Sequence, residues 1–191
     1  MSKVVVLENV TLDGVMQAPG RPDEDTRDGF EHGGWAAPYQ AMGSLMAEGA
    51  PQTEALLFGR RTYEDFASFW PTQGDNPYNE VLTRTPKYVA STTMREPLPW
   101  ENSTLLKGDA GDEVARLKEG TGGDLLIMGS GQLVQSLLRR NLIDEFTLLI
   151  HPLVLGTGRR LFPDGGAPAT LRLTESSTTP AGVVIGFYRV G

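Results

Sequence analysis

The stretch LLIMGSGQLVQSLLRRNLIDEFTLLIHPLVLGTGRRLF, residues 125–162, decides the fold. Its first four residues are a continuous apolar run, which is typical of a strand covered on both faces. Gly129 and Gly131 then bracket Ser130, and glycines allow both a tight turn and the close approach of a ligand to the backbone. An amphipathic helix follows, with leucine and valine on one side, and a second apolar strand comes after it. This order indicates an α/β protein.

The turn at residues 129–131 also predicts a binding site. A helix that begins at the carboxyl end of a buried strand presents free N–H groups and the positive end of its dipole, which suits a phosphate. The alternative is an ordinary strand-to-helix turn, since the sequence lacks the third glycine of the dinucleotide fingerprint and an acid near position 150. Arg139 and Arg140 in the last helical turn, with Asn141 as a left-handed stop, indicate where the helix ends.

Two other strand ends follow the same logic. The apolar strand at residues 56–58 ends at Gly59, and a helix then begins with Arg60 and Thr62, both able to bond an anion. The strand at residues 87–90 runs into three hydroxyl residues, 91–93, which can bond phosphate or ribose oxygens. Each group has a simpler interpretation as a surface charge, a helix N-cap or a turn hydroxyl. In a parallel sheet the three strand ends should share one edge, where open α/β sheets bind ligands.

The remaining elements complete the predicted fold. Strands are expected at 4–10, 105–106 and 147–151, helices at 38–48 and 112–119, long and polar loops at 17–34 and around Asn76-Pro77, and a hairpin from 171–175 and 183–190. We therefore predict one α/β domain over residues 1–191. Its fold would be a three-layer, mostly parallel mixed sheet with helices on both faces and a C-terminal antiparallel hairpin.

Composition narrows the function. With 17 basic and 24 acidic residues the net charge is −7 and the pI is near 4.9, which argues against nucleic acid and anionic membrane surfaces as partners. No cysteine is present, so disulfides, thiolate metal sites and cysteine nucleophiles are excluded, and two histidines are too few for a histidine metal cluster. No apolar run approaches the length of a membrane span, and the first residues do not suit a signal peptide. We expect a cytoplasmic protein with no metal.

The long loop at residues 17–34 leads into Phe30, His32 and Trp35, where aromatic groups lie beside glycines. Long loops in compact domains are usually functional or mobile. Two interpretations stay open at this point. The loop is either a lid on the substrate side or a segment that Trp35 pins to the core.

Several motifs in this order resemble the dihydrofolate reductase superfamily, and most closely the branch that holds the reductase domain of the bifunctional riboflavin-biosynthesis deaminase-reductase. The motifs are Leu12-Asp13-Gly14, Phe58-Gly59-Arg60-Arg61-Thr62-Tyr63, Lys87-Tyr88-Val89-Ala90-Ser91-Thr92, Gly129-Ser130-Gly131-Gln132-Leu133, Leu142-Ile143-Asp144-Glu145 and the segment His151–Gly158 with Leu161-Phe162. Together they cover nearly the whole chain.

The resemblance implies a reductase that uses NADPH. It places the adenosine phosphate side of the cofactor on Gly59, Arg60, Thr62, Ser91 and Thr92, and the pyrophosphate on Gly129, Ser130, Gly131, Gln132 and Leu133. The implied reaction is hydride transfer to a C=N or C=O carbon of a small pterin-, flavin- or aminopyrimidine-like heterocycle. This activity is related to that of 5-amino-6-(5-phosphoribosylamino)uracil reductase.

The chain departs from the family pattern at two points. Folate reductases carry a carboxylate on the first helix, but residues 38–47 contain none, so Asp13, Asp28 and Glu31 remain as proton donors. Asp13 comes first because it follows a strand, although it could equally bond the turn at Gly14. Riboflavin-pathway reductases also tend to have an acid where this chain has Met128.

Two alternatives follow from these departures and from the apolar segment Leu148–Leu155. The first is a non-catalytic protein of the same fold that binds a nucleotide or flavin without turnover. The second is a homodimer whose interface is Leu148–Leu155, a segment that could instead lie inside the sheet.

Overall fold

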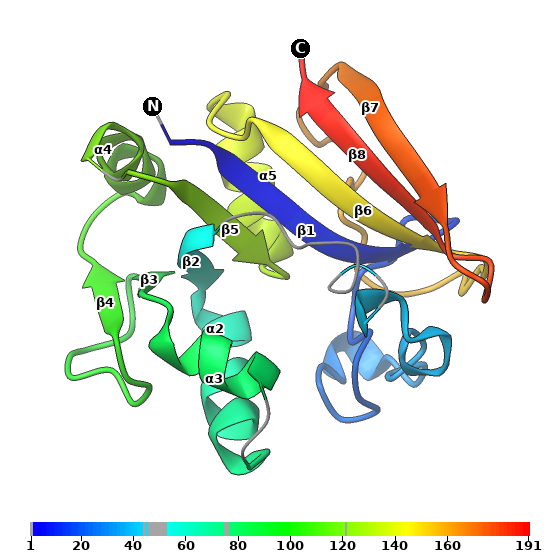
Figure 1. Cartoon of the computed structure of the whole chain (residues 1–191), viewed down its shortest axis with the longest axis horizontal. Helices are drawn as coiled ribbons and strands as arrows, with labels where there is room; N and C mark the ends of the chain where they lie inside the picture. Colours follow the sequence, from blue (N-terminus) through cyan, green and yellow to red (C-terminus); the bar gives the residue numbers. More distant parts are fainter. Residues whose placement is uncertain (1, 44, 46–52, 75–76, 121) are drawn as a thin grey trace. The chain divides into compact units, whose positions relative to one another are not determined.

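Eight strands form one mixed sheet in the computed structural model, in the order β4-β3-β2-β5-β1-β6-β8-β7. The structure describes residues 2–43, 45, 53–74, 77–120 and 122–191. Figure 1 labels its helices and strands, and its contacts group the chain into two compact units. Unit 1 comprises Met1–Val5 and Gln52–Ile143, and unit 2 comprises Val6–Pro51 and Asp144–Gly191. The α/β class is confirmed, while the assignment of a single domain stays a prediction.

Unit 1 holds the parallel part of the sheet. Its elements are β2 (Thr53–Gly59), α2 (Arg60–Phe69), the 3-10 turn η3 (Trp70–Thr72), α3 (Pro77–Arg84), β3 (Lys87–Ala90), β4 (Ser103–Leu106), α4 (Ala110–Gly120), β5 (Asp124–Met128) and α5 (Gly131–Arg139). Strand β2 pairs in parallel with β3 on one side and with β5 on the other, and β3 pairs in parallel with β4. Each strand predicted from residues 56, 87, 105 and 125 onward is confirmed.

The central helix of unit 1 forms for the reason its sequence pattern indicates. The four apolar residues at 133, 134, 137 and 138 are all buried, and together they make the one face that α5 presents to the core. Asn141 closes the helix with a φ of 54°, the left-handed conformation predicted for it. The four residues of β5 at 125–128 are buried as well, as expected for a strand covered on both faces.

The prediction of a polar loop around Asn76-Pro77 is wrong beyond its first residues, because α3 begins at Pro77. Proline suits the first helical position, where no N–H needs an intrahelical partner. At the far end of the helix the ammonium group of Lys87, which is fully buried, donates to the carbonyls of Thr83, Thr85 and Glu101 at 2.9, 2.9 and 3.0 Å. A cation at a helix C-terminus stabilises it. Asn76 itself lies outside the described residues.

Unit 2 holds the antiparallel part. Its elements are β1 (Val4–Thr11) from residue 6 onward, the 3-10 turns η1 (Arg27–Gly29) and η2 (Ala37–Tyr39), β6 (Glu145–His151), β7 (Leu171–Thr178) and β8 (Val184–Val190). Strand β8 pairs antiparallel with both β6 and β7, so the C-terminal hairpin is confirmed. The helix predicted at 38–48 is helical at 41–43 and 45, and residues 44 and 46–48 lie outside the described residues.

The long loop at residues 17–34 is tied to the core of unit 2. Phe30 and Trp35 are buried in a cluster with Val15, and the indole N–H of Trp35 donates to the carbonyl of Gln17 at 2.7 Å. Of the two interpretations of this loop, the structure therefore supports the one in which Trp35 pins it to the core.

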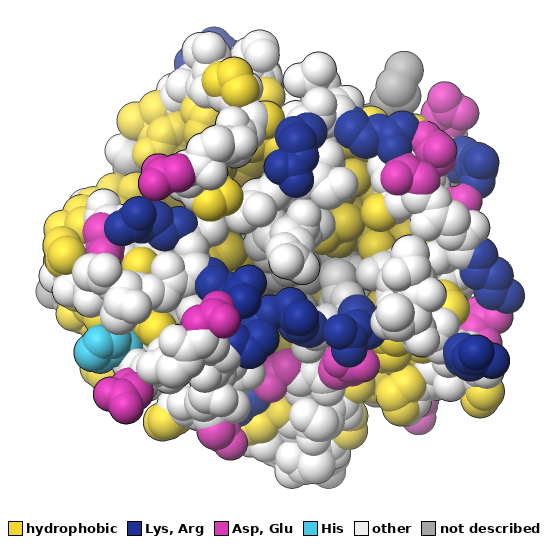
Figure 2. All heavy atoms as spheres, turned by 180° about the vertical axis from the view of Figure 1, so that it is seen from behind, with side chains coloured by type: hydrophobic (Ala, Val, Ile, Leu, Met, Phe, Trp, Pro, Cys, Tyr) yellow, Lys and Arg dark blue, Asp and Glu magenta, His cyan; other side chains and the backbone are white. Residues whose placement is uncertain are grey.

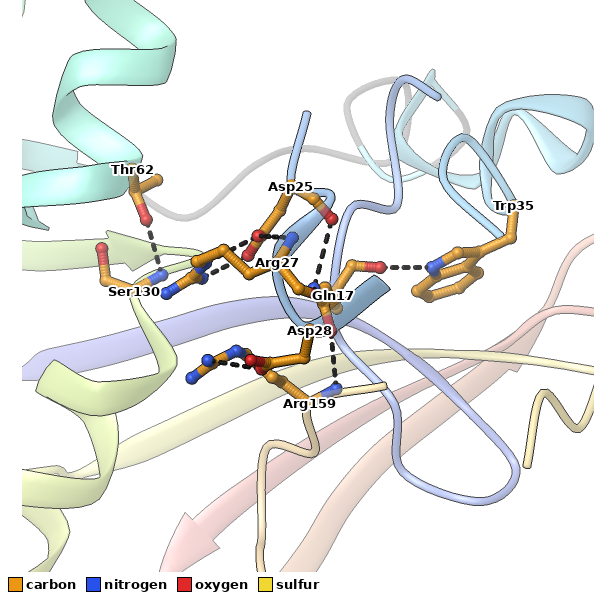
Figure 3. Close-up of polar contacts among 8 residues, drawn as sticks. All are labelled: Gln17, Asp25, Arg27, Asp28, Trp35, Thr62, Ser130 and Arg159. Carbon is orange, nitrogen blue, oxygen red and sulfur yellow. Dashed lines mark hydrogen bonds and ion pairs between the residues drawn. The ribbon is translucent and has the colours of Figure 1, made fainter. Parts of the chain in front are cut away.

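The side chain of Gln17 organises the same loop (Figure 3). Its amide nitrogen donates to the carbonyls of Asp25 and Arg27 at 3.2 and 3.1 Å, and its amide oxygen accepts from the backbone N–H of Arg159 at 2.9 Å. Arg27 also forms a two-pronged ion pair with Asp25. One buried amide thus satisfies three backbone groups from two parts of the chain.

The segment Leu148–Leu155 is mostly interior within unit 2. Leu148 and Leu149 are buried in β6, while Leu153 and Leu155 pack against the cluster around Val15. Pro152 and Val154 are exposed, Val154 with 66% of its surface. The segment therefore belongs to the core of its unit, and the homodimer stays a prediction.

Candidate functional site

The three predicted turns of unit 1 follow neighbouring parallel strands. Gly59, the last residue of β2, pairs in register with Ala90, the last residue of β3. On the β5 side of β2, Leu57 pairs with Ile127. Gly59 and Gly129 each lie two residues beyond this pair in the chain. The carboxyl ends of β3, β2 and β5 are thus side by side, as the sequence predicted.

Two hydroxyls join the start of α2 to the turn before α5, and Figure 3 shows the bond between Thr62 and Ser130. The hydroxyl of Ser130 accepts from the backbone N–H of Gly59 at 2.9 Å, and the hydroxyl of Thr62 accepts from the backbone N–H of Ser130 at 3.0 Å. We call this pair of bonds the Thr62–Ser130 clasp. Each hydroxyl uses an oxygen lone pair in the clasp, so each keeps its own proton to donate to a ligand.

The backbone at the clasp adopts conformations that most residues avoid. Ser130 has φ 63° and ψ 45°, the left-handed region, and Gly129 before it has φ +66°. A Cβ at Gly129 would lie 3.1 Å from the γ-methyl of Thr62, closer than ordinary contact. A non-glycine residue held in this region costs about 1–3 kcal/mol, and such strain clusters at ligand-binding turns.

The helices that begin at the clasp have unsatisfied donors. Neither α2 nor α5 has a side-chain N-cap. In the described part of the chain, the backbone N–H groups of Gly131, Gln132 and Leu133 have no hydrogen-bond partner. A helix leaves its first N–H groups free in this way, and with the dipole they form a site for an anion.

The other predicted phosphate-side residues have simpler contacts. Arg60 pairs with Glu64 at 3.1 Å, and its side chain is 39% exposed. Such exposed pairs one helical turn apart contribute only about 0.3–0.5 kcal/mol, so a phosphate could readily replace Glu64. The hydroxyl of Ser91 accepts from the backbone N–H groups of Thr93 and Met94 at 3.2 and 3.1 Å, which is a turn-closing role, and Thr92 is exposed.

Figure 2 shows Lys and Arg side chains with Asp and Glu side chains beside them on one face of a chain whose net charge is −7.

Asp13, the predicted proton donor, is a turn residue of unit 2. Its carboxylate accepts from the hydroxyl of Thr11 at 2.5 Å and from the backbone N–H groups of Leu155 and Gly156 at 3.2 and 2.8 Å. The bond from Thr11, followed by those from the two N–H groups, lowers the pKa of Asp13 below its ordinary value. A carboxylate with these contacts is ionised at neutral pH, and its geometry supports the alternative role of holding a turn.

The other two proton donors predicted from the sequence, Asp28 and Glu31, lie at the surface. The carboxylate of Asp28 is paired with the guanidinium of Arg159 at 2.7 Å, and 73% of its side chain is exposed. Glu31 is exposed. Neither position shields a carboxyl group from water.

Glu8, which sequence reasoning did not select, is the buried carboxyl of unit 2. It interrupts the apolar strand β1, and only 3% of its surface is exposed. One oxygen, Oε1, accepts from the backbone N–H of Asn9 at 3.2 Å, whereas Oε2 is buried without a partner. Burial, with a smaller effect from the charge of Glu24, raises the pKa of Glu8 well above its ordinary value. The interruption of the apolar run by a glutamate is the sequence signal that could have identified Glu8.

His151 is a second buried polar residue in unit 2. Its Nε2 lies 2.9 Å from the Oδ1 of Asn9, and its ring meets those of Trp35 and Tyr39 edge-on, with centroids 5.1 Å apart in both cases. Burial lowers the pKa of His151 to about 4, so the imidazole is neutral at physiological pH. Its Nδ1 is buried and has no partner.

Two further observations concern metals and membranes. Within the described ranges, no three His, Cys, Asp or Glu side chains are grouped so that they could hold a metal ion. None of the helices there is long and apolar enough to cross a bilayer.

The site thus combines an α/β sheet, a glycine turn with left-handed backbone, a clasp between two strand ends and free helix N–H groups. The chain belongs to the RibD C-terminal domain family, whose model matches residues 2–185. The resemblance seen in the sequence motifs is thereby confirmed.

Relatives cover most of the chain. It is 31% identical over 138 residues to the uncharacterized protein YyaP of Bacillus subtilis, a match that spans 70% of this chain and 72% of YyaP. It is 27% identical over 194 residues to the uncharacterized protein YwjB of the same organism, which spans 98% of both chains. Neither relative's name states an activity.

Solved structures show the same fold. A putative riboflavin biosynthesis protein from Shewanella sp. PV-4 matches with a TM-score of 0.69 and 24% identity, over 99% of both chains. A pyrimidine reductase-like protein from Corynebacterium diphtheriae matches with a TM-score of 0.62 and 12% identity, over 100% of this chain and 92% of the other. At these identities the likeness concerns the fold alone.

Proposed function

We propose that this chain is an NADPH-dependent reductase that transfers a hydride to a small heterocycle. The observation that carries the proposal is the Thr62–Ser130 clasp, which joins two helix N-termini at neighbouring strand ends. Free backbone N–H groups, two hydroxyl protons and a glycine turn too tight for a side chain suit a pyrophosphate. Membership of the RibD C-terminal domain family supports a reductase-like role.

The chain's own groups have defined tasks in this proposal. The N–H groups of residues 131–133 would bind the pyrophosphate, and Arg60 with the hydroxyls of Ser91 and Thr92 would bind the adenosine phosphate side. The absence of a ribose-binding acid after the glycine turn leaves room for the extra phosphate of NADPH. The nicotinamide, when bound, supplies the hydride, and the protein supplies alignment and a dry surrounding.

For the substrate we propose the aminopyrimidine class first, with pterins and flavins as the other members of the series. This choice follows the names of two structures that share the fold, a riboflavin biosynthesis protein and a pyrimidine reductase-like protein. All three heterocycles present a C=N or C=O carbon that can accept a hydride.

Calorimetry with NADPH, together with the loss of NADPH absorbance on adding each heterocycle, tests the proposal. We expect NADPH to bind and to be oxidised by at least one acceptor. Thr62→Val and Ser130→Ala should each weaken NADPH binding about tenfold, since each removes a hydroxyl worth about 1–1.5 kcal/mol. Thr104→Val, the same change as the first at an exposed position on β4, is the matched control and should leave binding unchanged.

Two results would count against the proposal in different ways. Binding of NADPH without oxidation by any acceptor would favour a non-catalytic nucleotide- or flavin-binding protein of the same fold, which the lack of a carboxylate in residues 38–47 would allow. No binding of NADPH, or equal losses in the Thr104→Val control, would reject the assignment of the clasp.

A further inference from the structure

The helices of unit 1 differ in where they carry their charges. In α3 the acid Glu80 lies in the first turn and the base Arg84 in the last. In α4 the acids Asp112 and Glu113 come first and Lys118 comes last. The dipole of a helix favours this order, because its first N–H groups attract anions and its last carbonyls attract cations. These two helices are therefore stabilised by their own charges.

Helix α2, which the structure describes in full, has the opposite order. It begins with Arg60 and Arg61, and across its described residues the first turn holds no acid, the last turn holds no base and no side chain caps the start. Two positive groups thus lie against the positive end of the helix dipole, which is the unfavourable end for them. A bound anion offsets this repulsion, so the arrangement favours a negatively charged ligand group at the start of α2.

The start of α2 belongs to the site already described. Gly59, the residue before Arg60, is held to Ser130 by the clasp, and Thr62 in the same turn forms the second bond of the clasp. In the proposed function, the anion beside Arg60 is the phosphate on the adenosine ribose of NADPH. NADH has a hydroxyl group in place of that phosphate. The groups around Arg60 therefore bear on the choice between the two cofactors.

In the structure Arg60 is paired with Glu64, one helical turn further on. One guanidinium nitrogen, Nη1, donates to both carboxylate oxygens, to Oε1 at 3.3 Å and to Oε2 at 3.1 Å. Contacts from a single nitrogen lack the two-pronged geometry of strong Arg–carboxylate pairs. The base also precedes the acid, which is the weaker order for a pair four residues apart. The two side chains are 39% and 48% exposed, so a ligand can reach both.

We infer that Glu64 limits how strongly the site prefers NADPH to NADH, because it competes with the extra phosphate of NADPH for Arg60. This inference rests on the proposed function. When that phosphate binds, the guanidinium exchanges the Glu64 carboxylate for phosphate oxygens, and Glu64 is left close to a second negative group. Both effects lower the affinity for NADPH. NADH leaves the ion pair intact, so its affinity does not depend on Glu64.

Glu64→Gln is the decisive variant, because it keeps the length of the side chain and removes its charge. In calorimetry at low salt, the Kd for NADPH should fall about two- to fivefold, since an exposed ion pair and one like-charge contact are lost. The Kd for NADH should change less than about 1.5-fold. Glu80→Gln removes the acid of the other pair four residues apart, that with Arg84 on α3, and is the matched control. It should leave both Kd values unchanged.

Two further measurements separate competition for Arg60 from a structural role of Glu64. In the Arg60→Gln background, Glu64→Gln should improve NADPH binding by a smaller factor than it does alone, because the contested guanidinium is gone. Without cofactor, Glu64→Gln should lower the melting temperature no more than Glu80→Gln does, because Glu80 lies in the turn that the dipole favours for an acid. A residue kept for the stability of α2 would show the larger loss.

The outcomes separate the two proposals. If NADPH binds and Glu64→Gln leaves its affinity unchanged or lowers it, the inference about Glu64 is overturned and the reductase stands. An equal gain for NADH, an equal gain in the Arg60→Gln background, or a larger loss of melting temperature than in the control would overturn the inference in the same way. If the unaltered protein does not bind NADPH, the proposed function fails first and the inference fails with it.

Discussion

Gly129→Ala should damage both the stability and the cofactor affinity of this chain. The left-handed backbone at φ +66° costs an alanine about 1 kcal/mol, as it would at any such position. The new methyl would also lie 3.1 Å from the γ-methyl of Thr62, and relieving that contact adds about 1–2 kcal/mol. For a chain of this size the sum of about 2–3 kcal/mol lowers the melting temperature by about 4–12 °C.

A matched control isolates the part of this effect that belongs to the clasp. Gly74 has φ +70°, and a methyl group added there would meet no atom of the described residues within 4 Å, so Gly74→Ala has the backbone cost alone. It should lower the melting temperature by about 2–4 °C and leave NADPH binding unchanged. Gly129→Ala should also weaken NADPH binding at least tenfold, which is about 1.4 kcal/mol.

A second substitution tests the stated cause. Thr62→Ser removes the γ-methyl but keeps the hydroxyl that accepts from Ser130. In the Gly129→Ala background it should restore the melting temperature to that of Gly74→Ala, as measured by calorimetry or circular dichroism. Equal losses in Gly129→Ala and Gly74→Ala, or no recovery in the double variant, would refute the close packing of this turn.

Three other predictions follow from buried polar groups. The raised pKa of Glu8 means that its contribution to the free energy of unfolding is complete below the ordinary pKa of glutamate and is lost as the pH rises through the folded value. Urea unfolding of Glu8→Gln across acidic to neutral pH should lack that decline, and a parallel decline in both proteins would contradict the assignment. Lys87→Met leaves three backbone carbonyls without their hydrogen-bond donor and should lower the free energy of unfolding, measured in urea, by about 3–5 kcal/mol. A loss under about 1 kcal/mol would show that water replaces the ammonium group. Gln17→Leu removes three hydrogen bonds and should speed amide exchange across residues 17–34, with no change in β6.

The parts of the fold that the sequence predicted are those with a strong local signal. Apolar runs that end at glycine mark β2 and β5, and the 3.6-residue period marks α5, because burial of one face decides where a helix forms. The neighbouring positions of the strand ends followed from the rule that parallel strands share their carboxyl edge. These features depend on residues close together in the chain.

Other features depend on contacts that no local pattern records. The helix α3 was missed because Asn76-Pro77 is a turn signal, and its far end depends on Lys87 and Glu101, further along the chain. The clasp could be predicted only as two separate turns, since Thr62 and Ser130 are 68 positions apart. Glu8 was not predicted as a site residue, because the sequence does not show whether a polar side chain in an apolar strand has a hydrogen-bond partner.

The division of the chain into two units bears on how it is synthesised. Unit 2 draws on residues 6–51 and on residues 144–191, so its first segment leaves the ribosome long before its second. Residues 17–34 and their ties to Arg159 cannot settle until Arg159 has been synthesised. Unit 1 ends at Ile143 and can fold earlier, so a nascent chain whose residue 143 has just left the ribosome should carry a protease-resistant unit 1 beside an unprotected N-terminal loop.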